Sequence, residues 1–404
     1  MEDKKESYII MFKPKDKRKD KKSDKTEIFA SVTKSDLNFV EPRNKMRIAT
    51  IPDEEISFDI NQYQAPILTA SLTKNQVTSL KKHDDIVSVE PDGKVYALGG
   101  FEIEGQPSLS ASETVPYGID AVKAPLAWDI TKGKGIKVAV VDTGIDYTHP
   151  DLKTNYRGGI SFVPTETDPK DHNRHGSHVA GTIAASMNGL GVIGVAPSAY
   201  LYAVKVLGSA GQGNWSWLIA GLDWCITNKM QVANMSLGSP TAAPTAVESI
   251  CNLAWENGLI LVAAAGNEGT QKPVGYPAKY KSVIAVSAID SSNVIAPFSC
   301  TGPEVEVCAP GVNITSTVPG GGYSSLSGTS MASPHVAGVA ALALSTHRWP
   351  LGGVPQNVAI RRLLAATSDN LGIPGRDKVF GFGRVDAEEA AFSMDIPPTL
   401  PGIP

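Results

Sequence analysis

Residues 136–146 read IKVAVVDTGID, an apolar run that stops at an acidic residue, a small hydroxyl residue and a glycine. Because the run lacks polar alternation, it predicts a strand that is buried on both faces of a sheet. Similar runs recur at 201–206, 232–235, 259–264 and 283–286. Helical patterns lie between the runs, at 215–228, 246–256 and 331–347. This alternation predicts an α/β domain with a mostly parallel, doubly wound sheet and helices on both faces, whose ligand site lies beyond the carboxyl ends of the strands.

The composition of the chain excludes several classes of protein. With 404 residues, 42% of them hydrophobic and 19% charged, the chain can bury a sizeable core and is long enough for two or three domains. The net charge of -4 argues against nucleic acid as the main partner. No apolar run reaches about 18 residues, so we expect no transmembrane helix. Four cysteines are too few for a disulfide scaffold.

Residues 1–98 predict a small α+β domain that precedes the sheet domain. One helix is expected at 73–83, with Thr73 as its N-cap. The expected strands lie at 8–12, 47–51 and 86–89. The Lys-rich segment 13–25 predicts a solvated loop; the alternative, an arm that binds polyanions, is disfavoured by its interspersed Asp residues.

Composition also sets the expected domain boundaries. Residues 99–113 (GGFEIEGQPSLSASE) are rich in Gly, Ser and Pro without a period, which is typical of a linker. The sheet domain is expected over 114–393, followed by a Pro-rich tail at 394–404. The first apolar run, 8–12, is shorter than the core of a signal peptide, which has about 7–15 residues.

Three polar segments point to nucleophilic catalysis. The strand at 136–141 delivers Asp142 at its carboxyl end, RHGSHVAGT contributes His175 and His178, and SGTSMASPHVAG presents Ser330 where a Gly-rich turn becomes a helix. A serine nucleophile needs a base to take its proton and a carboxylate to orient that base. His175 and His178 have the spacing of half a zinc site, but the sequence suggests no third ligand nearby.

Six motifs together resemble those of the subtilisin-family serine proteases, the subtilases. In chain order they are DTGID at 142–146, HGSHVAGT at 175–182, NMSLG at 234–238, AAAGNEG at 263–269, VGYPAKY at 274–280 and GTSMASPHVAG at 328–338. Residues 7–98 resemble the propeptide of this family more weakly, through YIIMF near the start and SVEPD near the end.

The resemblance implies a serine endopeptidase that is made as an autoprocessed zymogen. Asp142 would orient His175, His175 would take the proton of Ser330, and Asn267 would stabilise the oxyanion with the backbone N–H of Ser330. Residues 1–98 would assist folding and inhibit the site until they are cut off. The substrates would be proteins or peptides, and we expect a monomer.

The resemblance also implies how a substrate binds, as an added strand between two edges of the cleft. The edges are expected at Ser236, Leu237 and Gly238, and at Gly208, Gly211 and Gly213. The primary pocket is expected to be lined by Ala264, Gly266 and Gly275. Small lining residues favour large apolar side chains, and Glu268 at the rim could also admit basic ones.

A calcium site is a further implication, because hard cations prefer carboxylate and carbonyl oxygens. The expected ligands are Asp151, Ser186, Asn188, Leu190, Val192 and Glu113. Glu113 stands where the family has a Gln, and Ser177 stands where it more often has Thr. The alternative is a Gly-rich surface loop without metal.

Several points stay open in the sequence. Cleavage after Leu98 would suit an apolar pocket, whereas cleavage near Ser112 would free a terminus beside the calcium loop. Cys300 and Cys308 could form a disulfide, or all four cysteines could be free thiols. His178 and His335 resemble structural histidines of the family, and oxidation of Met331 would affect Ser330.

Function and location have alternatives too. A protease or peptide ligase that acts on one dedicated precursor would use the same three residues, and a catalytically silent scaffold is the alternative from another class. Secretion is expected from the propeptide and the calcium site, but the sequence lacks a signal peptide as given, which leaves an intracellular enzyme as the alternative.

Overall fold

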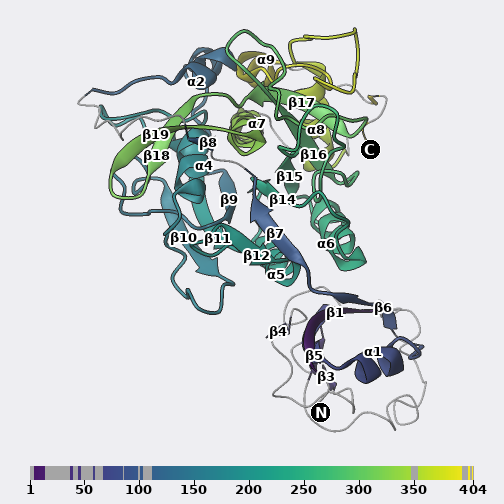
Figure 1. Ribbon diagram of the computed structural model, residues 1–404. Coiled ribbons are helices and arrows are strands. Elements are labelled where there is room, and N and C mark those ends of the chain that lie inside the picture. Colours follow the sequence, from purple (N-terminus) through teal and green to yellow (C-terminus); the bar gives the residue numbers. More distant parts are fainter. Residues whose placement is uncertain are drawn as a thin grey trace.

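The computed structural model describes residues 4–13, 37–39, 44–46, 58–59, 67–84, 86–98, 101–102, 112–346, 354–393, 399–400 and 403. A small N-terminal domain lies below a much larger α/β domain, and a single strand runs up from the first into the second (Figure 1). Among the described residues, no helix is long and apolar enough to cross a membrane.

The large domain is built on a seven-stranded sheet in which every pair of neighbouring strands is parallel. In spatial order the strands are β10 (Tyr156–Ser161), β11 (Tyr200–Lys205), β9 (Lys137–Asp142), β13 (Val232–Met235), β15 (Ile260–Ala264), β16 (Val283–Ile289) and β17 (Val305–Pro310). After β9 the chain builds β10 and β11 on one side and the other four strands on the opposite side. The carboxyl end of β9 is therefore the switch point at which open sheets place their ligands.

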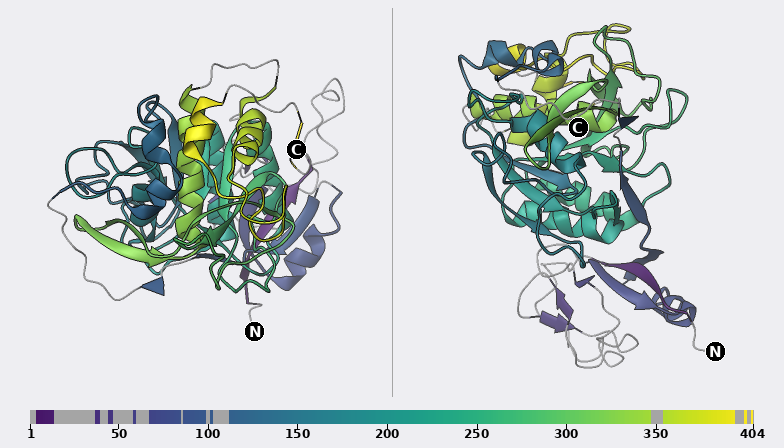
Figure 2. Two further views of the ribbon diagram at one scale, coloured as in Figure 1. Left: turned by 90° about the horizontal axis from the view of Figure 1, so that it is seen from above. Right: turned by 60° about the vertical axis from the view of Figure 1, so that its left-hand side comes forward.

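Helices cover both faces of this sheet, which confirms the doubly wound fold (Figure 2). Val138 and Val140 of β9 pack in one cluster with α4 (His175–Ala184) and α7 (Thr329–Thr346). α8 (Gln356–Ala366) and α9 (Ala387–Phe392) belong to the same cluster. The alternate residues, Ala139 and Val141, pack in a second cluster with α5 (Trp215–Thr227) and α6 (Thr245–Glu256). Burial of both strand faces explains the lack of polar alternation in the sequence.

The strands and helices predicted for this domain are confirmed, and none of their ends shifts by more than three residues. The sequence did not indicate β10, β17, α8 or α9, nor the hairpin of β18 (Ile314–Val318) and β19 (Gly322–Ser327). Two short helices, α2 (Tyr117–Ala121) and α3 (Ala124–Ala127), open the domain.

The N-terminal domain has an antiparallel sheet with the order β4 (Phe58–Asp59), β5 (Ile67–Leu72), β1 (Glu6–Phe12) and β6 (Ile86–Pro91). Its helix α1 (Lys74–Leu80) is shorter than predicted, but Thr73 caps it and forms a capping box with Gln76. β2 (Leu37–Phe39) and β3 (Asn44–Met46) pair separately. The predicted strand at 47–51 and nearly all of the Lys-rich segment lie outside the described residues.

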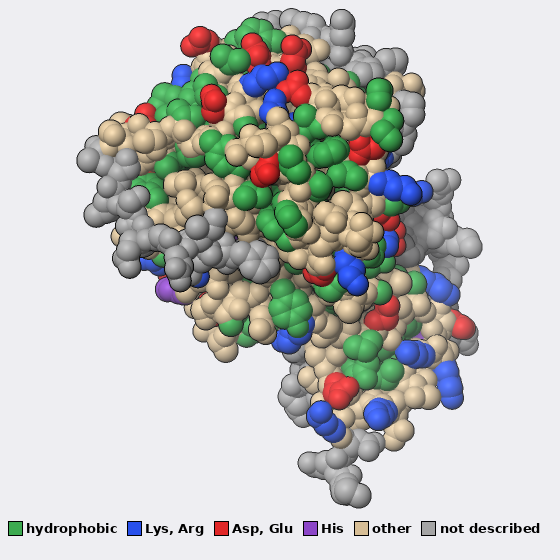
Figure 3. Space-filling model, turned by 45° about the horizontal axis from the view of Figure 1, so that its top comes forward, with side chains coloured by type: hydrophobic (Ala, Val, Ile, Leu, Met, Phe, Trp, Pro, Cys, Tyr) green, Lys and Arg blue, Asp and Glu red, His purple; other side chains and the backbone are tan. Residues whose placement is uncertain are grey.

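Basic side chains are numerous on the N-terminal domain, whereas acidic and basic side chains are scattered over the visible face of the large domain (Figure 3). The exposed lysines of the small domain include Lys4, Lys5, Lys74, Lys81 and Lys82. The contact between the domains uses carboxylates instead.

Two carboxylates of the N-terminal domain cap helices of the large domain. Glu90 accepts hydrogen bonds from the backbone N–H (3.0 Å) and the hydroxyl (2.5 Å) of Thr245, the first residue of α6. Asp92 accepts from the backbone N–H (3.1 Å) and the hydroxyl (2.7 Å) of Ser216, in the first turn of α5. Burial raises the pKa of Asp92 although these bonds oppose it. Because helix N-termini attract negative charge, both contacts favour docking of the N-terminal domain.

Candidate active site

Asp142 and His175 meet at the carboxyl end of β9. His175 begins α4, and its Nδ1 lies 2.7 Å from Oδ1 of Asp142, with both side chains buried. Burial lowers the pKa of His175, but the charge and the hydrogen bond of Asp142, with a further contribution from Asp171, outweigh burial and raise it. Nε2, on the other side of the ring, is buried and has no hydrogen-bond partner. The pair therefore holds a basic ring nitrogen ready to accept a proton.

Ser330 lies in the first turn of α7, beside a carbonyl from the N-terminal part of the chain. Its Oγ donates to the carbonyl oxygen of Leu98 and lies 2.9 Å from that of Ser236. With the hydroxyl turned this way, Ser330 makes no hydrogen bond to His175 in the structure. Nucleophile and base are often apart before the reaction begins, so this geometry leaves their pairing possible.

Asn267 holds the same carbonyl of Leu98 from another direction. Its Oδ1 accepts the backbone N–H (2.9 Å) and the hydroxyl (2.8 Å) of Thr329, which fixes the orientation of the amide. Its Nδ2 therefore points at the Leu98 oxygen and donates to it at 2.7 Å. A donor fixed in this way can stabilise negative charge that develops on that oxygen.

The strand β7 (Lys94–Ala97) fills the cleft between the two expected substrate-binding edges. It pairs antiparallel with β12 (Gln212–Asn214) on one side and with β14 (Leu237–Gly238) on the other. The N–H of Ala97 donates to Gly211 at 2.9 Å, and that of Leu98 donates to Ser236 at 3.2 Å. Of the expected edge residues, only Gly208 lies outside this pairing; its N–H closes a turn onto Gln212.

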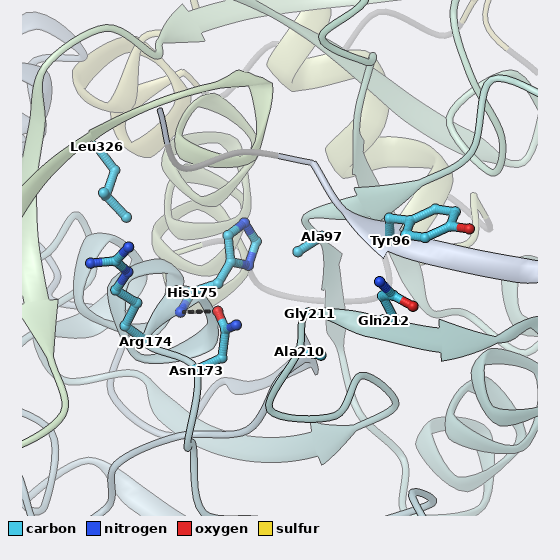
Figure 4. A pocket seen from close by; sticks show the side chains of 9 residues that line it. All are labelled: Tyr96, Ala97, Asn173, Arg174, His175, Ala210, Gly211, Gln212 and Leu326. Carbon is cyan, nitrogen blue, oxygen red and sulfur yellow. Dashed lines mark hydrogen bonds between the residues drawn. The ribbon is translucent and has the colours of Figure 1, made fainter. Parts of the chain in front are cut away.

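The chain also continues past Leu98 along the hairpin. β8 (Phe101–Glu102) pairs antiparallel with β19, with Glu102 opposite Leu326. The peptide bond after Leu98 is therefore flanked on both sides by strand pairing. A hollow of about 440 Å³ adjoins this strand, and His175 is one of the residues that line it (Figure 4).

The side chain of Leu98 is buried and lies against Gly238. A Cβ on Gly238 would come within 2.9 Å of it, so only glycine there leaves room. A Cβ on Gly266 would meet Oε2 of Glu268 at 2.7 Å and Sγ of Cys300 at 2.9 Å. The thiol of Cys300 lies 3.0 Å from that carboxylate oxygen, and burial raises its pKa to about 12.

All four cysteines are free and buried, so the alternative of a disulfide between Cys300 and Cys308 is wrong. Cys300 faces Glu268, whereas Cys308 lies within β17 and pairs through its backbone with Arg384. The remaining histidines of the motifs are also internal. Burial lowers the pKa of His178 to about 3 and that of His335 to about 4. Both bond backbone carbonyls, as expected of structural residues.

The buried carboxylate Asp171 joins the two elements that carry Asp142 and His175; no motif in the sequence pointed to it. Its Oδ1 accepts the hydroxyl of Thr143 at 2.9 Å and the backbone N–H of Arg174 at 3.0 Å. Its Oδ2 accepts the backbone N–H and the hydroxyl of Ser177, at 2.8 and 2.7 Å. The network fixes the end of β9 against the start of α4.

A buried ion pair lies behind Asp142. Lys205, at the end of β11, is fully buried and donates from Nζ to the carbonyl of Thr143 at 2.5 Å. The same Nζ lies 3.0 Å from Oε2 of Glu166, whose Oε1 accepts the N–H of Ser209 at 2.8 Å. The pair thus connects the carboxyl end of β9 with the loop that leads into β12.

The expected calcium ligands lie together around the loop that follows the C-terminal end of α4. Asp151 is fully buried; its Oδ1 lies 3.0 Å from the amide of Asn188, and its Oδ2 accepts from Val192 and Tyr323. Glu113 accepts the N–H groups of Asn188 and Gly189 at 2.6 and 2.8 Å. Among the described residues, no group of three or more His, Cys, Asp or Glu side chains could hold a metal ion, so any cation here would depend on carbonyl oxygens.

The ion pair predicts an asymmetric response to mutation. Glu166→Gln leaves the buried charge of Lys205 without its carboxylate and should lower the free energy of unfolding by about 3–5 kcal/mol, as in other broken buried pairs. Lys205→Met leaves the partly exposed Glu166 unpaired and should lower the free energy of unfolding by less. Urea unfolding of the two variants and of the double variant tests this. A double variant no more stable than Glu166→Gln alone would contradict it.

Comparison with known proteins agrees with this geometry. Residues 133–383 match the model of the Subtilase family (Peptidase_S8), and residues 7–98 match that of Peptidase inhibitor I9. The chain is 48% identical to Subtilisin E of Bacillus subtilis (strain 168) over 328 residues, which cover 80% of each chain. It is 51% identical to Subtilisin of Bacillus pumilus over 286 residues, 69% of this chain and 100% of that protein. It is 45% identical to M-protease of Shouchella clausii (strain KSM-K16) over 342 residues, 84% of this chain and 83% of that protein. The chain therefore belongs to the subtilase family and is a subtilisin-like serine endopeptidase with an N-terminal inhibitor I9 domain.

Proposed function

We propose that this chain is a zymogen that first cleaves its own Leu98–Gly99 bond and then hydrolyses other polypeptides. The observation that carries the proposal is the position of the Leu98 carbonyl, bound by Asn267 Nδ2 at 2.7 Å and in contact with the hydroxyl of Ser330. Strand pairing on both sides of the bond supports its being the first substrate.

In the proposed mechanism, Ser330 Oγ bonds to the carbonyl carbon of Leu98 while its proton passes to His175 Nε2. Asp142 stabilises the imidazolium that results, and Asn267 stabilises the negative charge on the Leu98 oxygen. Collapse of this intermediate breaks the bond to Gly99, and His175 gives its proton to the leaving amine. Water then attacks the acyl-enzyme with His175 as base, which releases a Leu98 carboxylate and restores Ser330.

The same geometry supports a preference for large apolar residues on the acyl side of the cut. Leu98 is buried beside Gly238, and the neighbouring carboxylate of Glu268 is engaged by the thiol of Cys300. A basic side chain would have to compete with that thiol for Glu268, so Leu-like residues should be favoured over Lys or Arg.

The N-terminal domain would act as an inhibitor after the first cut. Pairing of β7 with β12 and β14, together with the helix caps from Glu90 and Asp92, does not depend on the Leu98–Gly99 bond. The cleaved piece would therefore remain in the cleft and block protein or peptide substrates until it is degraded. We expect the processed enzyme to be a monomer.

Replacement of the nucleophile tests the proposal. The wild-type chain should convert into two pieces, one ending at Leu98 and one beginning at Gly99, whereas Ser330→Ala should stay intact. Asn267→Ala should slow the cut by about 10²–10³-fold, because one oxyanion donor is lost. Intact-mass spectrometry over time measures both effects.

Ser345→Ala, at the far end of α7, is the matched control and should be cut at the wild-type rate. Cleavage of Ser330→Ala, or a wild-type cut near Ser112 with Leu98–Gly99 intact, would contradict the proposal.

We also propose that calcium binds between Asp151 and the 186–192 loop. Asp151 would supply a buried carboxylate. Carbonyl oxygens would come from the backbones of Ser186, Leu190 and Val192, and side-chain oxygens from Asn188 and Glu113. Such a set of oxygen donors suits a hard cation. Pairing of Thr114 with Val192 would tie the start of the large domain to the site. A calcium requirement fits an enzyme that works outside the cell, and secretion remains our proposal.

Removal of the carboxylate tests the calcium site. At a calcium concentration 100 times the dissociation constant, binding should stabilise the Ser330→Ala chain by about 2.7 kcal/mol, and Asp151→Asn should lose most of this gain. Thermal unfolding with calcium and with chelator measures it. Asp168→Asn, which removes an exposed carboxylate, should keep the gain. A Ser330→Ala chain whose stability does not respond to calcium would contradict the proposal.

A further inference from the structure

Arg174 directly precedes His175 and forms the N-cap of α4 in an unusual conformation. Its φ is 112°, in the region that glycine adopts freely and other residues rarely do. Its side chain is exposed and lines the hollow beside His175. A long cationic residue at a position where glycine would be less strained suggests that the side chain serves a function there.

Arg174 lies on the side of the cleft that receives residues after the cut. In Figure 4, Arg174 and Leu326 lie on one side of His175, and Tyr96 and Ala97 lie on the other. Ala97 belongs to the acyl side of the Leu98–Gly99 bond. Leu326 pairs with Glu102, four residues beyond that bond. The guanidinium is therefore next to the leaving part of a substrate.

The charges around Arg174 favour an acidic partner from the substrate. Among the described residues that line this hollow, Arg174 and His175 are the two that can carry a positive charge, and none carries a carboxylate. In the adjoining depression, Lys170 adds positive charge, and the carboxylates Asp146 and Asp171 are buried and already accept several hydrogen bonds. The sequence after the cut reads GGFEIE, and residues 99–122 contain acidic residues but neither Lys nor Arg.

We propose that Arg174 makes this protease prefer substrates with Asp or Glu within the first four residues after the cut. The inference rests on the proposed function, because it assigns the two sides of the cleft from the Leu98–Gly99 bond. A guanidinium pairs with a carboxylate through charge-assisted hydrogen bonds, and in an exposed site the gain is modest. We expect Glu to be preferred over Lys by about three- to tenfold in kcat/KM at low salt.

The experiment uses processed enzyme and peptides with Leu on the acyl side, followed by Gly-Gly-Phe-X, where X is Glu, Gln or Lys. A second series moves Glu through the first four positions. The readout is the Glu-to-Lys ratio of kcat/KM within each enzyme variant, so differences in active-enzyme concentration cancel. Wild type should give a ratio above one that decreases as salt is added.

Three variants separate charge from backbone effects. Arg174→Lys should keep most of the preference, Arg174→Gly should abolish it, and Arg174→Glu should invert it. Arg174→Gly should melt no lower than wild type, because glycine accepts the φ of 112° without strain. The matched control is Arg157→Glu, which makes the same charge change at an exposed residue on β10 and should keep the wild-type ratio.

The possible results distinguish failure of the role of Arg174 from failure of the proposed protease function. If the Gln peptide is still cleaved, any of three results would overturn the role of Arg174. These are a wild-type Glu-to-Lys ratio of one, a ratio that Arg174→Glu leaves unchanged, and an equal change of the ratio in Arg157→Glu. Failure of wild type to cleave any of the peptides would instead contradict the proposed function.

Discussion

The carbonyl of Leu98 is the point on which the rest of the structure converges. Its oxygen takes a 2.7 Å hydrogen bond from Asn267, and its neighbours are held by strand pairing to β12, β14 and β19. An open parallel sheet provides this convergence, because the loops after its strands meet at one edge. Asn267 follows β15, Asp142 ends β9, and α7 presents Ser330 between them. The N-terminal domain is thus both the first ligand of the cleft and, on our proposal, its first substrate.

Rigidity behind these groups comes from buried polar contacts rather than from the reacting residues themselves. Asp171 joins Thr143 to the first turn of α4, and Lys205 joins Thr143 to Glu166 and the loop before β12. Buried charges are costly unless they are paired, so these contacts are satisfied only in one arrangement of strand, helix and loop. That requirement holds the carboxylate of Asp142 against Nδ1 of His175 before a substrate binds.

The sequence predicted the fold where burial leaves a periodic signal, as in the apolar runs of β9, β11 and β15 and the helices α5 and α6. It missed β10 (YRGGIS), which is poor in large apolar residues; Gly159 in this strand lets the backbone of Ala203 approach closely. Motif resemblance pointed to Asp142, His175, Ser330 and Asn267; the structure pairs Asp142 with His175 and places Ser330 and Asn267 on the carbonyl of Leu98. Asp171 and Lys205 could not be recognised, because a charged residue in a sequence predicts solvent exposure unless its partner is known. The roles of the catalytic and calcium residues remain predictions.

A crystal structure of the uncut Ser330→Ala chain would show directly whether Leu98 occupies the cleft. We predict a continuous Leu98–Gly99 bond in the cleft, with the Leu98 oxygen within hydrogen-bonding distance of Asn267 Nδ2 and β7 paired on both sides. An empty cleft, or a cleft that holds a segment near Ser112 in place of Leu98, would contradict it.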